Sequence, residues 1–269
     1  MEKYVIAKHD DGTVICVSDI HRVLLSMMKD LDAVLRKHNI PYWLVGGSAL
    51  GAVRHGGFIP WDDDMDIGML RKDYERFLKV ALADLDDKYV FQCYETDDRF
   101  NPCVPAKLIL KGTHIKEYNT LLKNKCPYGD GLFIDVFVCD EVSMKRSQDL
   151  PPRLTNVILM GMITALENIG MNPKALKNLF MKNARHYGKR NYDSDTIGYA
   201  LTWCFNSLLE PVRYPRDSVF PLQYVKFEDT MLPIPRNPHI MLDVEVSKNH
   251  MSYPPLKEQR PKHIRDAEL

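Results

Sequence analysis

The stretch from Trp43 to Asp66 constrains this chain most, because it joins an apolar run, a glycine pair and an acidic cluster. It reads WLVGGSALGAVRHGGFIPWDDDMD. The aspartates at positions 62, 63, 64 and 66 repel one another, so folding tolerates them best when a cation lies among them. The stretch therefore predicts a metal site, which would need further ligands and a phosphate-binding element from the chain.

The residues before this acidic cluster have the pattern of a strand, a turn and a helix. Tyr42–Val45 is aromatic and β-branched enough for a strand, and residues 48–54 read as a short helix. The backbone amides of Gly46, Gly47 and Ser48 would then lie at a helix start, where a phosphate can bind. Glycine pairs are also common at ordinary turns, so this pattern alone leaves phosphate binding open.

The four aspartates divide between the two faces of an extended backbone. Asp64 and Asp66 are two residues apart, so both project to the same face and can bind one or two divalent cations. Asp62 shares that face, and is an additional metal ligand, an outer-shell hydrogen-bond acceptor or an exposed loop cap. Asp63 points the other way, and we expect it to cap the loop and to be exposed to solvent.

A further acid lies in the strongly apolar strand expected at residues 132–138. Burying the unpaired charge of Asp135 there costs several kcal/mol, which favours the same cation as its partner. Asp135 is thus the best candidate for the third ligand. Mg²⁺ or Mn²⁺ would bridge phosphate oxygens and lower the pKa of an attacking hydroxyl.

Periodicity along the chain predicts an α+β fold, with a mixed sheet against flanking helices. We expect residues 1–150 to form the catalytic core and residues 151–269 a helical substrate or acceptor region with a closing hairpin, packed as one unit with the core. The expected strands are 4–7, 13–17, 42–45, 67–70, 89–94, 106–110, 114–118, 132–138, 222–227 and 231–234. The expected helices are 18–38 capped by Ser18 or Asp19, 48–54, 71–85, 152–169, 173–187, 195–208 and a short one after 237.

Composition excludes some classes of partner. Lysine plus arginine and aspartate plus glutamate both number 36, so nothing global favours nucleic acid or an anionic membrane. The six cysteines form no Cys-x-x-Cys pair, which favours buried free thiols, and we expect neither a signal peptide nor a membrane span. These features predict a cytoplasmic protein. The basic residues between Lys174 and Arg190 are most often a solvated face, and alternatively attract an anionic acceptor or the inner face of a membrane.

The segment from Gly47 to Asp66 resembles the signature of the LicD family, which includes the fukutin-related proteins. The resemblance continues through residues 73–77, 106–108 with 113, and 133–137. The family is related to nucleotidyltransferases of the polymerase β type, whose glycine turn, Asp-x-Asp pair and later strand aspartate occur here in that order. The resemblance implies a nucleotidyltransferase-like fold.

What the resemblance implies is transfer of a phospho-alcohol group, typically phosphocholine from CDP-choline, to a hydroxyl. The acceptor would be a cell-surface glycan or its lipid-linked precursor, as in lipopolysaccharide or teichoic acid. Asp64, Asp66 and Asp135 would bind the metals, with Lys107 and Arg54 as phosphate contacts. Two alternatives stay open: a nucleotidyltransferase that uses a nucleoside triphosphate, and a non-catalytic protein that binds nucleotide or glycan.

Two further points concern histidines and the C-terminal region. His55 is interpreted as a hydrogen-bonding scaffold rather than a base. The chain keeps the family's Pro254-Pro255 pair and His263, but has Asp243-Val-Glu-Val-Ser-Lys where relatives show a Tyr-Gly-Asp segment. That departure bears on donor or acceptor recognition and leaves the metal site intact.

Overall fold

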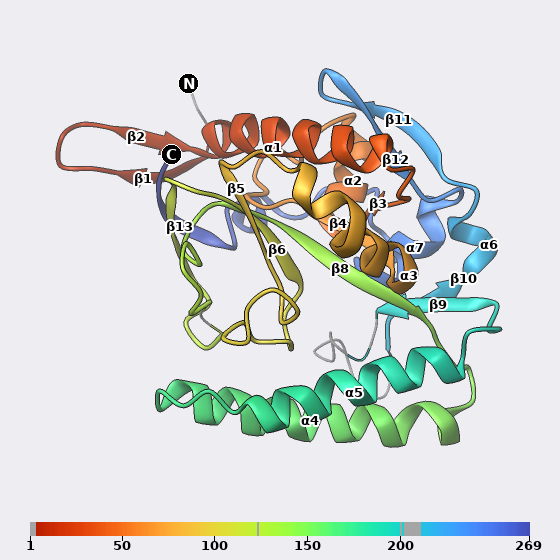
Figure 1. Cartoon of the computed structure of the whole chain (residues 1–269). Coiled ribbons are helices and arrows are strands. Elements are labelled where there is room, and N and C mark those ends of the chain that lie inside the picture. The colour runs from red at the N-terminus through yellow and green to blue at the C-terminus, as the bar shows by residue number, and fades with distance from the viewer. Residues whose placement is uncertain (1–3, 123, 200, 202–210) are drawn as a thin grey trace.

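The computed structural model describes residues 4–122, 124–199, 201 and 211–269. A mixed sheet of seven strands lies between two groups of helices (Figure 1). Helix α1 (Val17–Lys37) crosses one side of the sheet, and the hairpin of α4 (Arg146–Asn168) and α5 (Lys174–Arg190) runs along the other. No helix among the described residues combines the length and apolar character needed to cross a membrane.

Strand β8 (Phe133–Glu141) organises the sheet. It pairs in parallel with β4 (Asp66–Leu70) and antiparallel with β6 (Ala106–Leu110) and β9 (Thr196–Tyr199). The sheet is completed by β3 (Trp43–Leu44), β5 (Tyr89–Gln92) and β10 (Arg213–Pro215). The predicted mixed sheet with flanking helices is therefore confirmed. The similarity of this fold to that of nucleotidyltransferases stays a prediction.

Helix α1 forms as its apolar spacing predicts, but it starts differently. Ile20, Leu24 and Leu31 are fully buried against the core, as expected for an amphipathic helix. The predicted cap at Ser18 or Asp19 is wrong, because the helix begins after Cys16 and the Asp19 carboxylate accepts a hydrogen bond from the Cys16 amide at 2.9 Å. The hairpin before it, β1 (Val5–Lys8) and β2 (Val14–Cys16), is confirmed.

The helix predicted over residues 195–208 is wrong where the structure describes it. Residues Thr196–Tyr199 form β9, because Ile197 and Tyr199 are buried where this strand pairs with β8. Residues 200 and 202–210 lie outside the described part. The helix predicted over 71–85 is divided into α3 (Arg71–Arg76), a π-helical turn over 77–81 and a 3₁₀ turn over 82–84.

Strand β7 (His114–Glu117) follows the predicted turn at residues 111–112 but does not pair back onto β6. Both edges of β6 are already occupied by β5 and β8. Strand β7 pairs instead with β13 (Ile264–Glu268), a strand that the sequence analysis did not predict. This pairing fixes the C-terminal segment beside the core.

The remaining elements close the molecule around the start of α2 (Gly46–His55). The predicted hairpin is confirmed as β11 (Gln223–Phe227) and β12 (Thr230–Ile234), and the predicted short helix as α7 (Pro238–Glu245). A short helix α6 (Arg216–Val219) precedes them. Helix α7 contacts α2 and so brings C-terminal residues to the glycine turn.

Candidate active site

The glycine pair forms the turn between β3 and α2. Gly46 has a φ of +53°, which favours glycine, and α2 begins there rather than at Ser48 as predicted. A Cβ at Gly47 would overlap Oδ2 of Asp62. The pair therefore allows both the sharp turn and the close approach of an aspartate to the helix.

The side chain of Ser48 makes a contact that was not predicted, while phosphate binding by its backbone amide stays a prediction. Its side chain is 5% exposed, and its Oγ accepts a hydrogen bond from the Asp66 amide at 2.9 Å. This bond fastens the first turn of α2 to the first residue of β4. The helix start and the Asp-x-Asp pair are thereby held together.

Three charged residues lie side by side on three adjacent strands. Asp66 on β4 is opposite Asp135 on β8, which is opposite Lys107 on β6. The Nζ of Lys107 lies 2.7 Å from Oδ1 of Asp135, and these side chains are only 10% and 17% exposed. The structure thus brings together the two predicted ligands on neighbouring strands, and gives Asp135 a lysine partner.

The aspartates of the predicted metal site have too little positive charge around them for all of them to ionise. Burial raises the pKa of Asp66 well above its usual range, and the charges of Asp64 and Asp135 raise it further. Burial also raises the pKa of Asp64, and burial with the charge of Asp64 raises the pKa of Asp62 to about 8. For Asp135, burial outweighs the opposing effect of Lys107, so its pKa is also raised. Ionising the whole cluster would require additional cationic charge.

Asp62, Asp64 and Asp66 line one cavity of about 670 Å³, as the prediction of a shared face requires. Gly46 and Gly47 line it too, whereas Asp135, Lys107 and Ser48 are not among its lining residues. The opposite wall comes from the C-terminal residues Glu245, His250, Tyr253, Pro254, Lys262 and His263. The site therefore forms between the predicted core and a segment some 200 residues further along the chain.

Asp63 points away from this cavity, as predicted, but its predicted exposure is wrong. It is fully buried, and its carboxylate accepts hydrogen bonds from the amides of Lys262, His263 and Ile264. Burial acts to raise the pKa of Asp63, but the hydrogen bond to the side chain of His263, together with the amide bonds, outweighs it and holds the pKa low. Asp63 thus fastens the C-terminal segment next to the acidic cluster.

His263 is a site residue that the sequence analysis did not assign. Its Nδ1 lies 3.0 Å from Oδ2 of Asp64 and 3.1 Å from Oδ1 of Asp63. Burial lowers the pKa of His263, but the bond to Asp63 and the charges of Asp64 and Asp66 together raise it to about 10. The one signal available beforehand was that His263 belongs to the family-like C-terminal pattern.

Arg54 and His55 lie at the other end of α2. Nη1 of Arg54 donates to the carbonyl oxygens of His250 and Ser252, at 2.7 and 3.0 Å, and the guanidinium lies over the ring of Tyr253. Arg54 lines the cavity, where a phosphate could reach it. The ring of His55 packs edge-on against Trp61 and Tyr253, but neither ring nitrogen has a hydrogen-bond partner among the described residues, so the predicted hydrogen-bonding role of His55 is not confirmed.

Glu245, at the end of α7, is a second site residue that the sequence analysis missed. Its carboxylate accepts hydrogen bonds from the Gly46 amide at 2.8 Å and from the Tyr214 hydroxyl at 3.3 Å. Burial raises its pKa to about 7. Glu245 therefore binds one of the amides expected to hold a phosphate, and it belongs to the segment that departs from the family pattern.

The side chains at this site suit Mg²⁺ or Mn²⁺. Asp64, Asp66 and Asp135 offer only carboxylate oxygens, which both ions prefer, and their raised pKa values show a shortage of positive charge. The most compact group of ligand atoms in the described chain is instead Asp62, Asp63 and His263, within 4.8 Å of one another. The carboxylate of Asp63 already accepts hydrogen bonds from three backbone amides. We therefore favour Asp64, Asp66 and Asp135 as the metal ligands.

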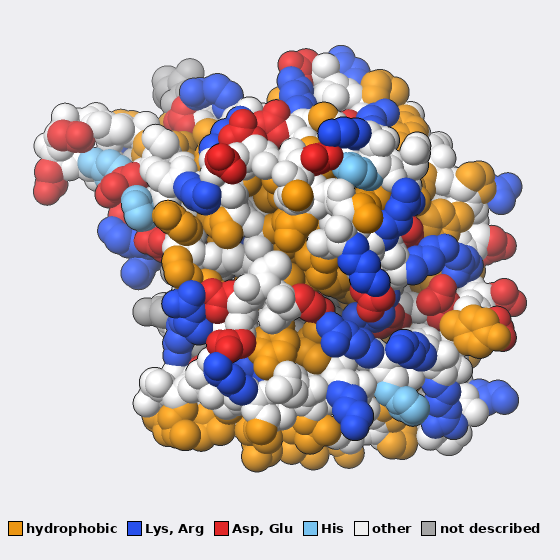
Figure 2. Space-filling view, in the orientation of Figure 1, with side chains coloured by type: hydrophobic (Ala, Val, Ile, Leu, Met, Phe, Trp, Pro, Cys, Tyr) orange, Lys and Arg blue, Asp and Glu red, His pale blue; other side chains and the backbone are white. Residues whose placement is uncertain are grey.

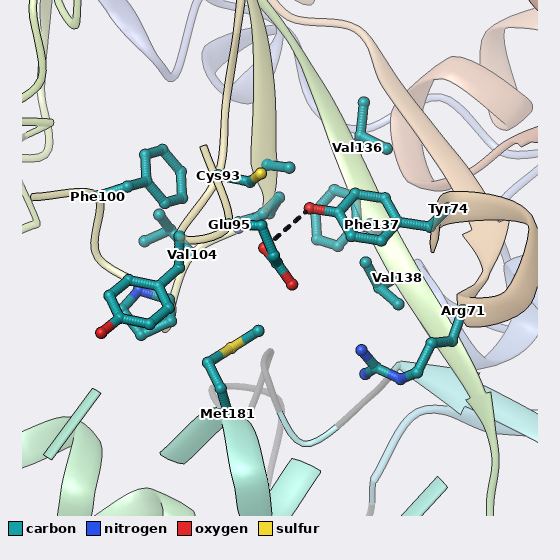
Figure 3. Close-up of a pocket in the computed structure, with 14 residues that line it drawn as sticks. Arg71, Tyr74, Cys93, Glu95, Phe100, Val104, Val136, Phe137, Val138 and Met181 are labelled. Carbon is teal, nitrogen blue, oxygen red and sulfur yellow. Dashed lines mark hydrogen bonds between the residues drawn. The ribbon is translucent and has the colours of Figure 1, made fainter. Parts of the chain in front are cut away.

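A second cavity lies between the sheet, α3 and α5 (Figure 3). It encloses about 30 Å³, room for roughly one water molecule. Its lining is mostly apolar, and its two charged groups are paired: Arg71 with Asp140, and Glu95 with Arg185. We therefore assign the chemistry to the larger, acidic cavity.

Part of the chain matches a known protein family. Residues 39–101 match the model of the LicD/FKTN/FKRP nucleotidyltransferase domain. The chain contains a LicD-family domain. The match covers the glycine turn and the four clustered aspartates, whereas Lys107, Asp135, Glu245 and His263 lie beyond it.

Individual relatives of this LicD-family domain are phosphotransferases where a function is named. The lipopolysaccharide cholinephosphotransferase LicD of Haemophilus influenzae is 24% identical over 269 residues, covering 91% of this chain and 95% of that protein. The human ribitol 5-phosphate transferase FKRP is 46% identical over 52 residues, which is 19% of this chain and 10% of FKRP. The uncharacterised protein RP689 of Rickettsia prowazekii is 54% identical over 109 residues, 39% of this chain and 40% of that protein.

Proposed function

We propose that this chain is a metal-dependent phosphotransferase of the LicD type, which moves phosphocholine from CDP-choline to a hydroxyl of a glycan or its lipid-linked precursor. The observation that carries the proposal is the direct pairing of Asp66 with Asp135 beside Asp64, at a cavity that also contains the start of α2. The named activities of the cholinephosphotransferase LicD and of FKRP support the same reaction class.

The reaction forms one bond and breaks another at the phosphorus that carries the alcohol. The acceptor oxygen bonds to this phosphorus, the bond to the bridging oxygen breaks, and CMP and the hydroxyl proton are released. Mg²⁺ or Mn²⁺, held by Asp64, Asp66 and Asp135 with Asp62 as a further ligand, would supply positive charge to the phosphate oxygens.

The chain's own residues would bind and orient the donor. Gly47 at the start of α2 and the guanidinium of Arg54 line the cavity and suit the phosphates of a CDP-alcohol, whereas the Gly46 amide would first have to leave Glu245. Lys107 holds Asp135 in place and offsets its charge. A cavity of about 670 Å³ is within the range that binds ligands of nucleotide size.

A donor panel tests the proposal. The purified chain is incubated with Mn²⁺ or Mg²⁺ and CDP-choline, CDP-ribitol, CDP-glycerol, ATP or CTP, with and without glycan acceptors, and the nucleotide products are measured. Acceptor-stimulated release of CMP from CDP-choline supports the proposal. Release of CMP from CDP-ribitol or CDP-glycerol instead would show that the chain transfers a different phospho-alcohol. Release of pyrophosphate from ATP or CTP would show that the chain is a nucleotidyltransferase.

A matched pair of variants separates the site from the rest of the surface. Asp64→Asn removes one ligand charge from the cavity and should abolish turnover while the chain stays folded. Asp130→Asn removes an exposed aspartate that pairs with His114, and should turn over like the unmodified chain. Near-normal turnover by Asp64→Asn would show that the ligand assignment is wrong.

A further inference from the structure

The outer face of α4 exposes a stripe of large apolar side chains. Leu154, Ile158 and Met162 recur every fourth residue along one face of the helix and are 44%, 55% and 47% exposed. Ile169, just after the helix end, extends the stripe and is 72% exposed. Figure 2 shows hydrophobic side chains along the lower edge of the molecule, where α4 lies in Figure 1.

This stripe has no packing role among the described residues. The opposite face of α4 already packs on α5, where Leu159 and Ile163 join Phe180 and Met181 in a buried cluster. Solvent exposure of several large apolar side chains in a row is unusual for a helix with a complete internal partner, and marks an interaction surface.

The two helices carry a strong excess of positive charge. Residues 144–190 contain nine lysines and arginines but two acids, a formal charge of +7 in a chain whose total is zero. Both acids are buried in ion pairs, Asp149 with Arg153 at 2.9 Å and Glu167 with Lys177 at 2.7 Å. The exposed charges of the hairpin are therefore basic: Lys145, Arg146, Lys174, Lys182, Lys189 and Arg190. Only Lys174 of these has an acidic partner among the described residues, Asp98.

We propose that the outer face of the α4–α5 hairpin binds the surface of an anionic lipid bilayer, with the stripe of Leu154, Ile158, Met162 and Ile169 entering the headgroup region. An apolar helix face flanked by lysine and arginine is the composition that lies in the plane of such a surface. A second copy of this chain fits the face less well, because a symmetric pair would oppose two surfaces of like charge.

This proposal does not depend on the transfer reaction, so each can fail alone. If both hold, the hairpin would keep the enzyme at the surface that carries a lipid-linked acceptor. The binding measurement below uses no substrate and no metal.

Flotation of the full chain with lipid vesicles tests the proposal. The chain should float with vesicles of equimolar phosphatidylglycerol and phosphatidylcholine, stay behind with phosphatidylcholine alone, and dissociate as salt is added. The double variant Ile158→Gln/Met162→Gln should lower the partition coefficient by about tenfold or more, because both side chains lose their apolar burial in the bilayer. The triple variant Lys182→Gln/Lys189→Gln/Arg190→Gln should lower the partition coefficient for anionic vesicles, because it removes three positive charges.

A matched control removes a similar apolar area elsewhere. Tyr224 and Met231 on the β11–β12 hairpin are 49% and 48% exposed, and Tyr224→Gln/Met231→Gln should bind vesicles like the unmodified chain. Thermal unfolding of each variant confirms that it is folded. Failure of the unmodified chain to float, or equal loss in the control, overturns the proposal. So does a dimer in light scattering that Ile158→Gln/Met162→Gln converts to monomer without vesicle binding, since that result assigns the face to a second copy.

Discussion

Asp66 and Asp135 are direct neighbours across the parallel pairing of β4 and β8, although 68 residues separate them in the sequence. Parallel pairing places both side chains at the same level of the sheet, with Asp64 two residues before Asp66. Lys107 joins from the other side of β8. This arrangement gives the chain a buried acidic centre in which Lys107 is the counter-charge of Asp135 and His263 lies beside Asp64.

Lys107→Met should destabilise the metal-free protein by about 3 kcal/mol, because it leaves the buried carboxylate of Asp135 without its partner. Lys107→Met/Asp135→Leu should recover most of this loss, since neither charge then remains. Urea unfolding gives the free energies for both. Lys116→Met serves as the control, because its partner Asp266 and its own side chain are more exposed, and it should cost less than about 1 kcal/mol. Equal losses in the two lysine variants would contradict the role of the pair.

Gly47→Ala should reduce CDP-alcohol turnover by at least about tenfold, because its Cβ overlaps Asp62 and displaces it from the cavity. The matched control is Gly161→Ala in α4, where a Cβ meets no atom within 4 Å. That substitution should keep turnover and stabilise the helix by about 0.5–1 kcal/mol. Full activity of Gly47→Ala would mean that Asp62 has no part in the reaction.

Glu245→Gln should change how stability depends on pH. Because burial raises the folded-state pKa of Glu245 from 4.5 to about 7, the folded chain retains a proton that the unfolded chain loses in this interval. Glu245 therefore contributes fully to the free energy of unfolding below pH 4.5. This contribution falls by up to about 3 kcal/mol as the pH rises to 7. Glu245→Gln should flatten this slope in chemical unfolding measured across that range. The exposed Glu268→Gln should keep the slope of the unmodified chain, and an unchanged slope in Glu245→Gln would refute the buried environment.

The parts of the site that local sequence patterns predict are those formed by neighbouring residues. The glycine turn, the shared face of Asp62, Asp64 and Asp66, and the opposite direction of Asp63 all follow from positions within one short stretch, whereas the burial of Asp63 does not. Asp135 could be placed because a lone acid in an apolar strand needs a partner. The partner of Asp135 could not be predicted, because the register that places Lys107 beside Asp135 depends on how three strands align.

The residues that escaped prediction are brought in by long-range pairing. His263 reaches Asp64 because β13 pairs with β7 and because Asp63 binds three amides of the C-terminal segment. Glu245 reaches Gly46 because α7 packs on α2. The strand β9 was mistaken for a helix because its pattern is short, and burial beside β8 decides its conformation. Local periodicity carries no information on such distant contacts.

The most direct measurement of the central claim is the thermal stability of the chain as Mn²⁺ is added, with and without CDP-choline. A metal site made by Asp64, Asp66 and Asp135 predicts that a hundredfold excess over Kd adds about 2.7 kcal/mol. This raises Tm by about 5 to 10 °C in a chain of this size, and CDP-choline should raise it further. Asp66→Asn should remove the response while Asp130→Asn keeps it. No shift in the unmodified chain, or an equal shift in Asp66→Asn, would contradict the account.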